Sequence, residues 1–201
     1  MTTSLIWRRD MREYVSDIAF TDKVKEIQKQ KGSRDIYANM EQRGSWDDTV
    51  TDYLAGFIAE RDSFYMATVS SEGQPYIQHR GGPKGFIKVI DKHTLGFADF
   101  RGNRQYISYG NLEENNKVCL FFMDYPNRTR IKLWGTSVVN ETDEALIEQL
   151  SVSDYKGEVE RAILIHVEAW DRNCPQHINP RYTKQEISDL DMCPGCEPEK
   201  D

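Results

Sequence analysis

Four polar residues at the end of an apolar run have the types and spacing of an anion-binding site. In FADFRGNRQY, residues 97–106, Arg101, Gly102, Asn103 and Arg104 lie where a strand-like pattern gives way to a helix-like one. The first turn of a helix offers unpaired N–H groups to an anion. Arg104 could grip phosphate oxygens in a fork, Asn103 could cap the helix, and Gly102 would let the backbone approach. The alternative is an ordinary capped loop with solvated arginines.

A second basic cluster surrounds a glycine-rich break. In IQHRGGPKGFIK, His79, Arg80, Lys84 and Lys88 flank two glycines and a proline. The strands joined by this break could turn Arg80 and Lys88 toward one cleft; the alternative is an exposed hairpin loop with a charged rim. The chain has neither a GxGxxG nor a Walker pattern, so these glycines are not a nucleotide fingerprint.

A third cluster opens a later strand. In NRTRIKLWG, strand alternation puts Arg130, Lys132 and Trp134 on one face, opposite Ile131 and Leu133. Two cations and a tryptophan suit one edge of an aromatic, electron-rich ligand, although a solvated face would have the same composition. No GxSxG or HExxH pattern supplies a nucleophile or a catalytic metal. Any catalysis would therefore rely on a cofactor.

The end of the chain carries residues of the kinds that bind zinc. CPQH contains Cys174 and His177, and CPGC contains Cys193 and Cys196. The C-x2-H and C-x2-C spacings match a structural zinc site. The alternatives are thiol-bearing loops without metal, or a redox-sensitive CxxC pair. We predict no metal and keep these four residues as the zinc candidates.

Composition limits the class of protein. The chain has 201 residues and a formal net charge of −7, which argues against nucleic acid as a partner. Its longest apolar runs, such as VCLFFM and AILIHV, are far shorter than the roughly 20 residues that span a bilayer. The N-terminus has no long apolar segment of a signal peptide. We expect a cytoplasmic protein that does not enter a membrane.

Hydrophobic patterning predicts the elements that position these clusters. Residues 1–45 form an arm with a helix that begins after Thr21 and ends at Gly32, and a second helix covers 46–61. A further helix follows Asn103. With few helices between the strands, we expect an antiparallel barrel or strongly coiled sheet with helices at its edges. The strand segments are SFYMATVS, PYIQHR, FIKVID, TLGFADF, KVCLFFMD, RIKLWGTSVV and RAILIHVEAW.

Residues 50–182 resemble the pyridoxamine 5′-phosphate oxidase-like family of FMN-binding split barrels. The resemblance is carried by ERDSFYMATVSSEGQPYIQHRGGPKGFIKVID, by TLGFADFRGNRQYISYGNLEENNKVCLFFMDYPNRTRIKLWG and by CPQHINPRY. It implies a mostly β fold with flanking helices, an antiparallel split barrel. The implied division is an N-terminal helical arm at 1–45, an FMN-binding barrel at 46–172 and a tail at 173–201 that packs on the barrel.

The resemblance also implies the cofactor, the assembly and the site. It implies a homodimer with FMN at the subunit interface. The implied cofactor-binding residues are Arg80, Lys88, Phe97, Ala98, Asp99, Asn103, Arg104, Gln105 and Arg130, and the implied substrate-binding residues are His79, His177 and Arg181.

Three departures from the family pattern bear on function. Gln105 replaces the second phosphate-binding lysine, Arg101 is an extra residue, and NPRY with Arg181 only loosely matches the C-terminal substrate residues of the true oxidases. The resemblance implies an FMN-dependent oxidoreductase, and these departures leave its small substrate unknown. NAD(P)H is a possible electron donor. The alternative is a non-catalytic protein that binds or senses flavin or another cofactor, such as haem or a deazaflavin.

Overall fold

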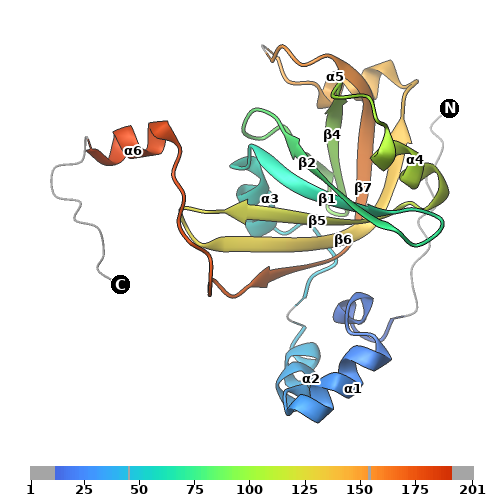
Figure 1. Ribbon diagram of the computed structural model, residues 1–201, viewed down its shortest axis with the longest axis vertical. Coiled ribbons are helices and arrows are strands. Elements are labelled where there is room, and N and C mark those ends of the chain that lie inside the picture. The colour runs from blue at the N-terminus through green and yellow to red at the C-terminus, as the bar shows by residue number, and fades with distance from the viewer. Residues whose placement is uncertain (1–11, 45, 154, 192–201) are drawn as a thin grey trace.

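Seven antiparallel strands form one sheet in the described part of the chain. The structure is a computed structural model that describes residues 12–44, 46–153 and 155–191. The strand order is β2-β1-β5-β6-β7-β4-β3, and Figure 1 shows β4 upright while β5 and β6 lie across it. The strands predicted from patterning are confirmed. Their bounds are β1 Ser63–Val69, β2 Pro75–Gly81, β3 Lys88–Asp91, β4 Thr94–Phe100, β5 Lys117–Asp124, β6 Thr129–Asn140 and β7 Val159–Asn173.

The two longest strands carry the bend of the sheet. β6 lies between β5 and β7, and β7 lies between β6 and β4. The register of β6 against β7 shifts between Trp134 and Gly135. A Cβ at Gly135 would lie 2.2 Å from the carbonyl oxygen of His166, so only glycine fits at this approach. The predicted fold class, a mostly β antiparallel split barrel with flanking helices, is confirmed.

Alternating apolar residues fill the interior of the coiled sheet. Phe64 lies at the centre of a cluster of aromatic rings, with its ring centroid 5.8 Å from that of Phe86, 5.2 Å from Phe97 and 5.4 Å from Phe122. All four side chains are at most 2% exposed. Because β1 and β5 alternate strictly, the same strands turn a second, half-exposed set of side chains outward.

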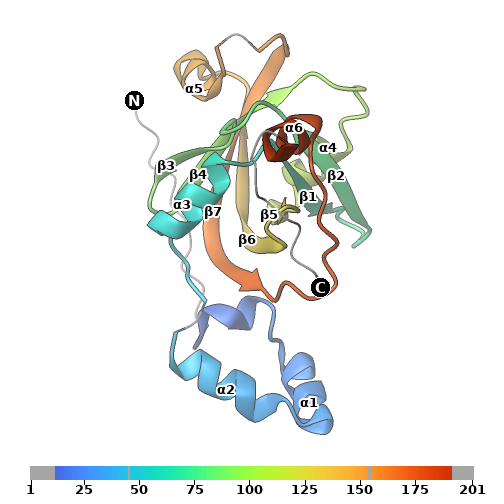
Figure 2. The same ribbon diagram turned by 90° about the vertical axis from the view of Figure 1, so that its left-hand side faces the viewer.

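The N-terminal arm contains two helices that the sequence does not predict. Helix α1, Asp22–Lys31, follows the Thr21 cap and ends at Gly32 with φ of 76°, as expected. Helix α2, Arg34–Gln42, and a short 3-10 helix, η1 at Val15–Ile18, were not predicted. Figures 1 and 2 show α1 and α2 together at one end of the molecule, beyond the sheet.

The link between the arm and the barrel is extended where a helix was predicted. Helix α3 covers only Asp52–Ala59, because the Thr51 hydroxyl accepts the first free N–H, that of Leu54, at 3.3 Å. Residues 46–50 run beside β7 instead, where Trp170 donates its backbone N–H to the Asp47 carbonyl at 2.8 Å. Trp46 stacks on Trp134, with ring centroids 5.0 Å apart. The predicted helix over 46–61 is therefore wrong in its first half.

Three further helices follow along the described part of the chain. They are α4 Ile107–Glu114, α5 Glu144–Leu150 and α6 Lys184–Asp191. Figure 1 shows α6 set apart from the sheet, beyond the ends of β5 and β6, and the division into arm, barrel and tail stays a prediction. No helix of the described residues is long and apolar enough to cross a membrane.

Candidate functional site

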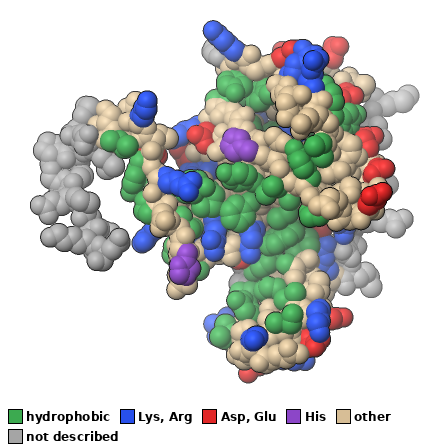
Figure 3. All heavy atoms as spheres, viewed as in Figure 1, with side chains coloured by type: hydrophobic (Ala, Val, Ile, Leu, Met, Phe, Trp, Pro, Cys, Tyr) green, Lys and Arg blue, Asp and Glu red, His purple; other side chains and the backbone are tan. Residues whose placement is uncertain are grey.

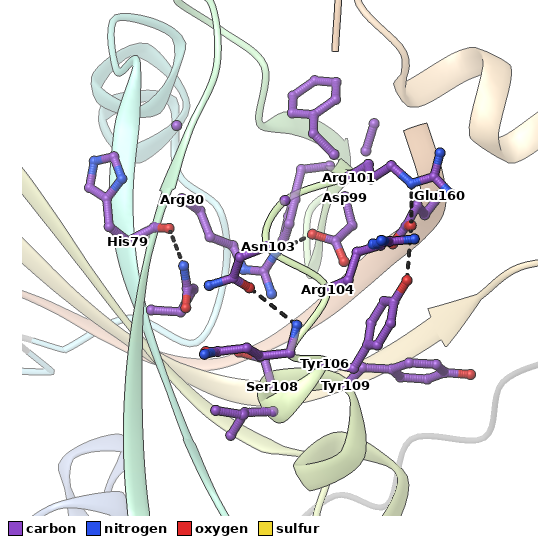
Figure 4. Close-up of a pocket in the computed structure, with 18 of the residues that line it drawn as sticks. His79, Arg80, Asp99, Arg101, Asn103, Arg104, Tyr106, Ser108, Tyr109 and Glu160 are labelled. Atoms are coloured by element: carbon purple, nitrogen blue, oxygen red, sulfur yellow. Dashed lines mark hydrogen bonds and ion pairs between the residues drawn. The ribbon is translucent and has the colours of Figure 1, made fainter. Parts of the chain in front are cut away.

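A cavity of about 330 Å³ opens between β2, β4 and the segment that leads into α4. Figure 4 shows side chains of these elements around the cavity, with Arg80 turned toward Asp99 and Tyr106 turned toward Glu160 of β7. The cavity brings together most of the predicted site residues from three separate parts of the sequence. Those that line it are His79, Arg80, Phe97, Ala98, Asp99, Asn103, Arg104 and Gln105.

Apolar rings lie beneath the polar rim of this cavity. Phe86 and Phe97 line it and are also members of the core cluster around Phe64. The guanidinium carbon of Arg80 lies 5.5 Å from the centroid of the Phe97 ring. A flat, partly apolar ligand could therefore contact the rings while its polar groups meet the rim.

The backbone before α4 differs from the predicted helix start. The helix begins at Ile107, not at Asn103, and the Asn103 Oδ1 accepts a hydrogen bond from the Gln105 N–H at 3.2 Å instead of capping it. Arg104 and Tyr106 have left-handed conformations, with φ of 58° and 52°. Each such residue costs about 1–2 kcal/mol when it is not glycine. We call residues 101–106 the wall loop; it replaces the first helical turn as the side of the cavity.

Asp99 joins two arginines below the wall loop. Its Oδ1 accepts a hydrogen bond from Arg80, and its Oδ2 lies 3.7 Å from the Nε of Arg161. Arg161 is only 4% exposed. Within the described residues, the Nε of Arg80 and the Nη1 of Arg161 are buried without a hydrogen-bond partner, so both guanidiniums keep donor capacity.

The arginines of the wall loop differ in their partners. Arg101 pairs with Glu158, a contact that raises the pKa of its guanidinium, and its Nε lies 3.3 Å from Glu160. For Arg104, no hydrogen bond or ion pair with another described residue holds the side chain. Arg104 is therefore the cation on the cavity wall whose charge is least compensated.

Four predicted site residues lie away from the cavity. Lys88 donates its Nζ to the carbonyl oxygens of Gln149 and Ser151, at 2.6 and 2.9 Å, and so holds the end of α5. Arg130 is on the outward face of β6, opposite Met123. His177 and Arg181 are in the tail, and the Arg181 guanidinium lies 4.8 Å from the Tyr125 ring. None of these four lines the cavity.

The zinc candidates divide between the described residues and the rest of the chain. Cys174 is exposed, and His177 has a φ of 63°. Cys193 and Cys196 lie outside the described residues. Among the residues that the structure describes, no three potential ligands are grouped around a metal position. The four-ligand zinc hypothesis thus stays untested.

Sequence reasoning missed several residues that line the cavity. Tyr76 and Gln78 alternate with Arg80 along β2, so strand periodicity could have found them. Tyr109 follows on α4, where burial and the neighbouring Glu141 carboxylate raise the pKa of its hydroxyl. Glu160 comes from a strand more than fifty residues away, and no local pattern indicates its place.

The fold and the cavity together define a split-barrel protein with an arginine-lined cleft beside a strand-to-helix junction. The sequence model for pyridoxamine 5′-phosphate oxidase matches residues 50–174. The chain therefore belongs to that family. No curated protein sequence matches it.

Solved structures resemble this chain at low sequence identity. HupZ from Group A Streptococcus is 19% identical, with 66% of this chain and 98% of that chain covered and a TM-score of 0.50. An FMN-binding protein from Syntrophomonas wolfei is 12% identical, with 73% and 97% covered and a TM-score of 0.48. At these identities the likeness concerns the fold.

Proposed function

We propose that the protein is a cytoplasmic flavoprotein that binds FMN in this cavity and acts as an oxidoreductase on a small substrate. The observation that carries the proposal is the position of Arg104, an uncompensated cation on the wall of a cavity with an aromatic floor. Membership in the pyridoxamine 5′-phosphate oxidase family supports a phosphate ester as the ligand.

The wall loop is the part that we propose to hold the phosphate. Arg104 would meet the phosphate oxygens, and the side-chain amide of Asn103 would donate to the same group. Charge-assisted contacts of this kind contribute roughly 1.5–3 kcal/mol each. The Arg101–Glu158 pair has side chains that are 44% and 62% exposed. Exposed pairs contribute little, so Arg101 could exchange partners when an anion enters.

The strand side of the cavity is the part that we propose to receive the flavin ring. Phe97 and Ala98 offer apolar contact, and Arg80 and Asp99 offer polar contact at the ring edge. Bound FMN would supply the hydride chemistry, while these residues would orient it and exclude water. Lys88 and Arg130 do not line the cavity of their own subunit, so we assign them no contact with the FMN bound there.

An FMN titration tests the proposed function. We expect the purified protein to show a flavin absorption band, or to quench flavin fluorescence on addition of FMN with a micromolar or lower Kd. Mass spectrometry of any released ligand separates FMN from haem and from a deazaflavin. A protein that neither carries nor takes up FMN would contradict the proposal.

A binding protein without turnover is the second candidate. The observation that favours it is that His177 and Arg181, the predicted substrate residues of the tail, do not line the cavity. Anaerobic addition of NADPH or NADH to the FMN-loaded protein separates the two candidates. Rapid bleaching of the flavin band supports an oxidoreductase, whereas an unchanged spectrum supports a carrier or sensor.

We further propose a homodimer that closes the cavity. The outward face of β1, β2 and β5 carries Tyr65, Ile77, Cys119 and Phe121, of which Ile77 is 62% exposed. Figure 3 shows hydrophobic side chains gathered on this side of the molecule, with basic side chains next to them. β2 contributes both to this face and to the cavity, so a second copy seated here would also border the cofactor.

Charge on this face should disrupt the dimer. We expect Ile77→Glu to shift the protein from dimer to monomer in light scattering, because two buried carboxylates would face an apolar surface. Val89→Glu is the control, since Val89 is 43% exposed on β3, at the other edge of the sheet. A wild-type protein that is monomeric at micromolar concentration would refute the dimer.

A further inference from the structure

The wall loop holds a strained backbone with few contacts of its own. Arg104 and Tyr106 are both left-handed, and the Asn103–Gln105 hydrogen bond is the side-chain contact within the loop. Its first residue is tied to the segment just before β7, because the Arg101 N–H donates to the Glu158 carbonyl at 2.7 Å. A left-handed non-glycine residue persists only where surrounding contacts hold it. The far end of the loop therefore needs an anchor.

Glu160 meets three separate groups, one at each end of the wall loop and one on β7. Its carboxylate accepts a hydrogen bond from the Tyr106 hydroxyl at 3.1 Å and from the Nη2 of Arg161 at 2.8 Å, and it lies 3.3 Å from the Nε of Arg101. The side chain is 16% exposed. One carboxylate thus joins both ends of the wall loop to β7 (Figure 4).

Tyr106 is held through its ring as well as through its hydroxyl. The guanidinium carbon of Arg161 lies 5.3 Å from the centroid of the Tyr106 ring and 4.3 Å from that of Tyr109. Arg161 is buried, so it is a fixed support. Tyr106 is 46% exposed, but two contacts hold its side chain, its ring on Arg161 and its hydroxyl on Glu160, and Arg104 lies only two residues before it.

We propose that Glu160 and Tyr106 form a clamp that positions Arg104 on the cavity wall and so determines the affinity for the phosphate part of the ligand. The inference rests on the proposed FMN binding. Both are positioning residues: they act through the loop. Among the described residues, neither clamp residue has a direct hydrogen bond or ion pair with Arg80 or Asp99, so we expect the strand side of the cavity, where the ring would lie, to be kept.

Electrostatics alone makes the opposite prediction for Glu160. A carboxylate on the wall of an anion site repels the ligand, so its neutralisation should tighten phosphate binding if Glu160 had no other role. The clamp predicts weaker binding, because the loop would lose its hold on Arg104. The direction in which FMN affinity changes in Glu160→Gln therefore separates the clamp from simple charge repulsion.

The experiment compares FMN with riboflavin, which has the same ring without the phosphate. Dissociation constants are measured by flavin fluorescence for the wild type, Tyr106→Phe, Glu160→Gln and the double variant. The matched control is Glu168→Gln, also on β7, with a side chain 20% exposed that pairs with Arg12 away from the cavity. We expect FMN binding to weaken about tenfold in each clamp variant, the loss of one charge-assisted hydrogen bond. Riboflavin binding should stay within about twofold, and the double variant should lose little more than either single variant.

The results distinguish the clamp from the proposed function. FMN binding that is unchanged or tighter in Glu160→Gln and Tyr106→Phe overturns the clamp while the FMN site stands. Equal losses for FMN and riboflavin also overturn it, because they indicate general damage to the fold. A wild-type protein that binds FMN no better than riboflavin overturns the phosphate site and the clamp with it.

Discussion

Arg104→Ala should weaken FMN binding by about 10- to 100-fold, while riboflavin binding stays nearly unchanged. The expected loss follows from one charge-assisted contact of roughly 1.5–3 kcal/mol. No described residue compensates the Arg104 charge, so its loss leaves no internal carboxylate unpaired. The effect should thus fall on ligand binding and not on folding. Fluorescence titration and a thermal melt of the same samples measure the two quantities.

Arg128→Ala is a close control for this substitution. Arg128 is also exposed and left-handed, with φ of 49°, and it lies in the turn between β5 and β6, outside the cavity. Both substitutions remove an arginine from a strained backbone position, so effects of net charge and of backbone strain should match. A similar loss of FMN affinity in both variants would show that general charge, and not the wall loop, attracts the ligand.

Phe64→Ala should have the largest effect on stability. The Phe64 ring is 1% exposed and packs against three other phenylalanine rings. Removal of a buried aromatic ring costs about 3–5 kcal/mol, which corresponds to a fall in Tm of about 10 °C for a chain of this size. Since Phe86 and Phe97 also line the cavity, the variant should bind both FMN and riboflavin more weakly.

Phe64→Leu gives the graded comparison. It keeps an apolar side chain at the centre of the cluster, so the loss should be smaller than for alanine, at about 1–2 kcal/mol. Differential scanning calorimetry of the two variants shows which of them has the lower Tm. A Tm for Phe64→Ala within 2 °C of the wild type would contradict a core centred on this ring.

Local sequence patterns predicted those helices and strands whose structure depends on residues close together in the sequence. Alternation in segments such as KVCLFFMD gave the strands, because one face of each strand is buried in the barrel. Thr21 and Gly32 marked the ends of α1 by their own capping chemistry. Helix α2 was missed because it begins only two residues after Gly32, where the helical pattern was taken to end, and a contact between Arg34 and Glu41 supports it.

Most of the predicted site residues line one cavity, but the geometry of that cavity was predicted less well. Arg80, Asn103 and Arg104 do meet in one cavity, as the resemblance implied. The helix start was wrong because Tyr106 adopts a left-handed conformation that contacts with β7 impose, and propensity carries no sign of it. Lys88 lies away from the cavity for a similar reason: carbonyl groups at the end of α5, some sixty residues later, bind its ammonium.

The contact between Gly135 and the His166 carbonyl has a consequence for sequence variation. Even a methyl group at position 135 would have to displace a main-chain oxygen of the adjoining strand, so the close approach of β6 to β7 at this register shift requires a glycine. Homologues with the same strand packing should vary in the residues on either side of position 135 but should keep glycine at position 135 itself. Redesign of the strand for a new ligand must therefore begin from a fixed glycine.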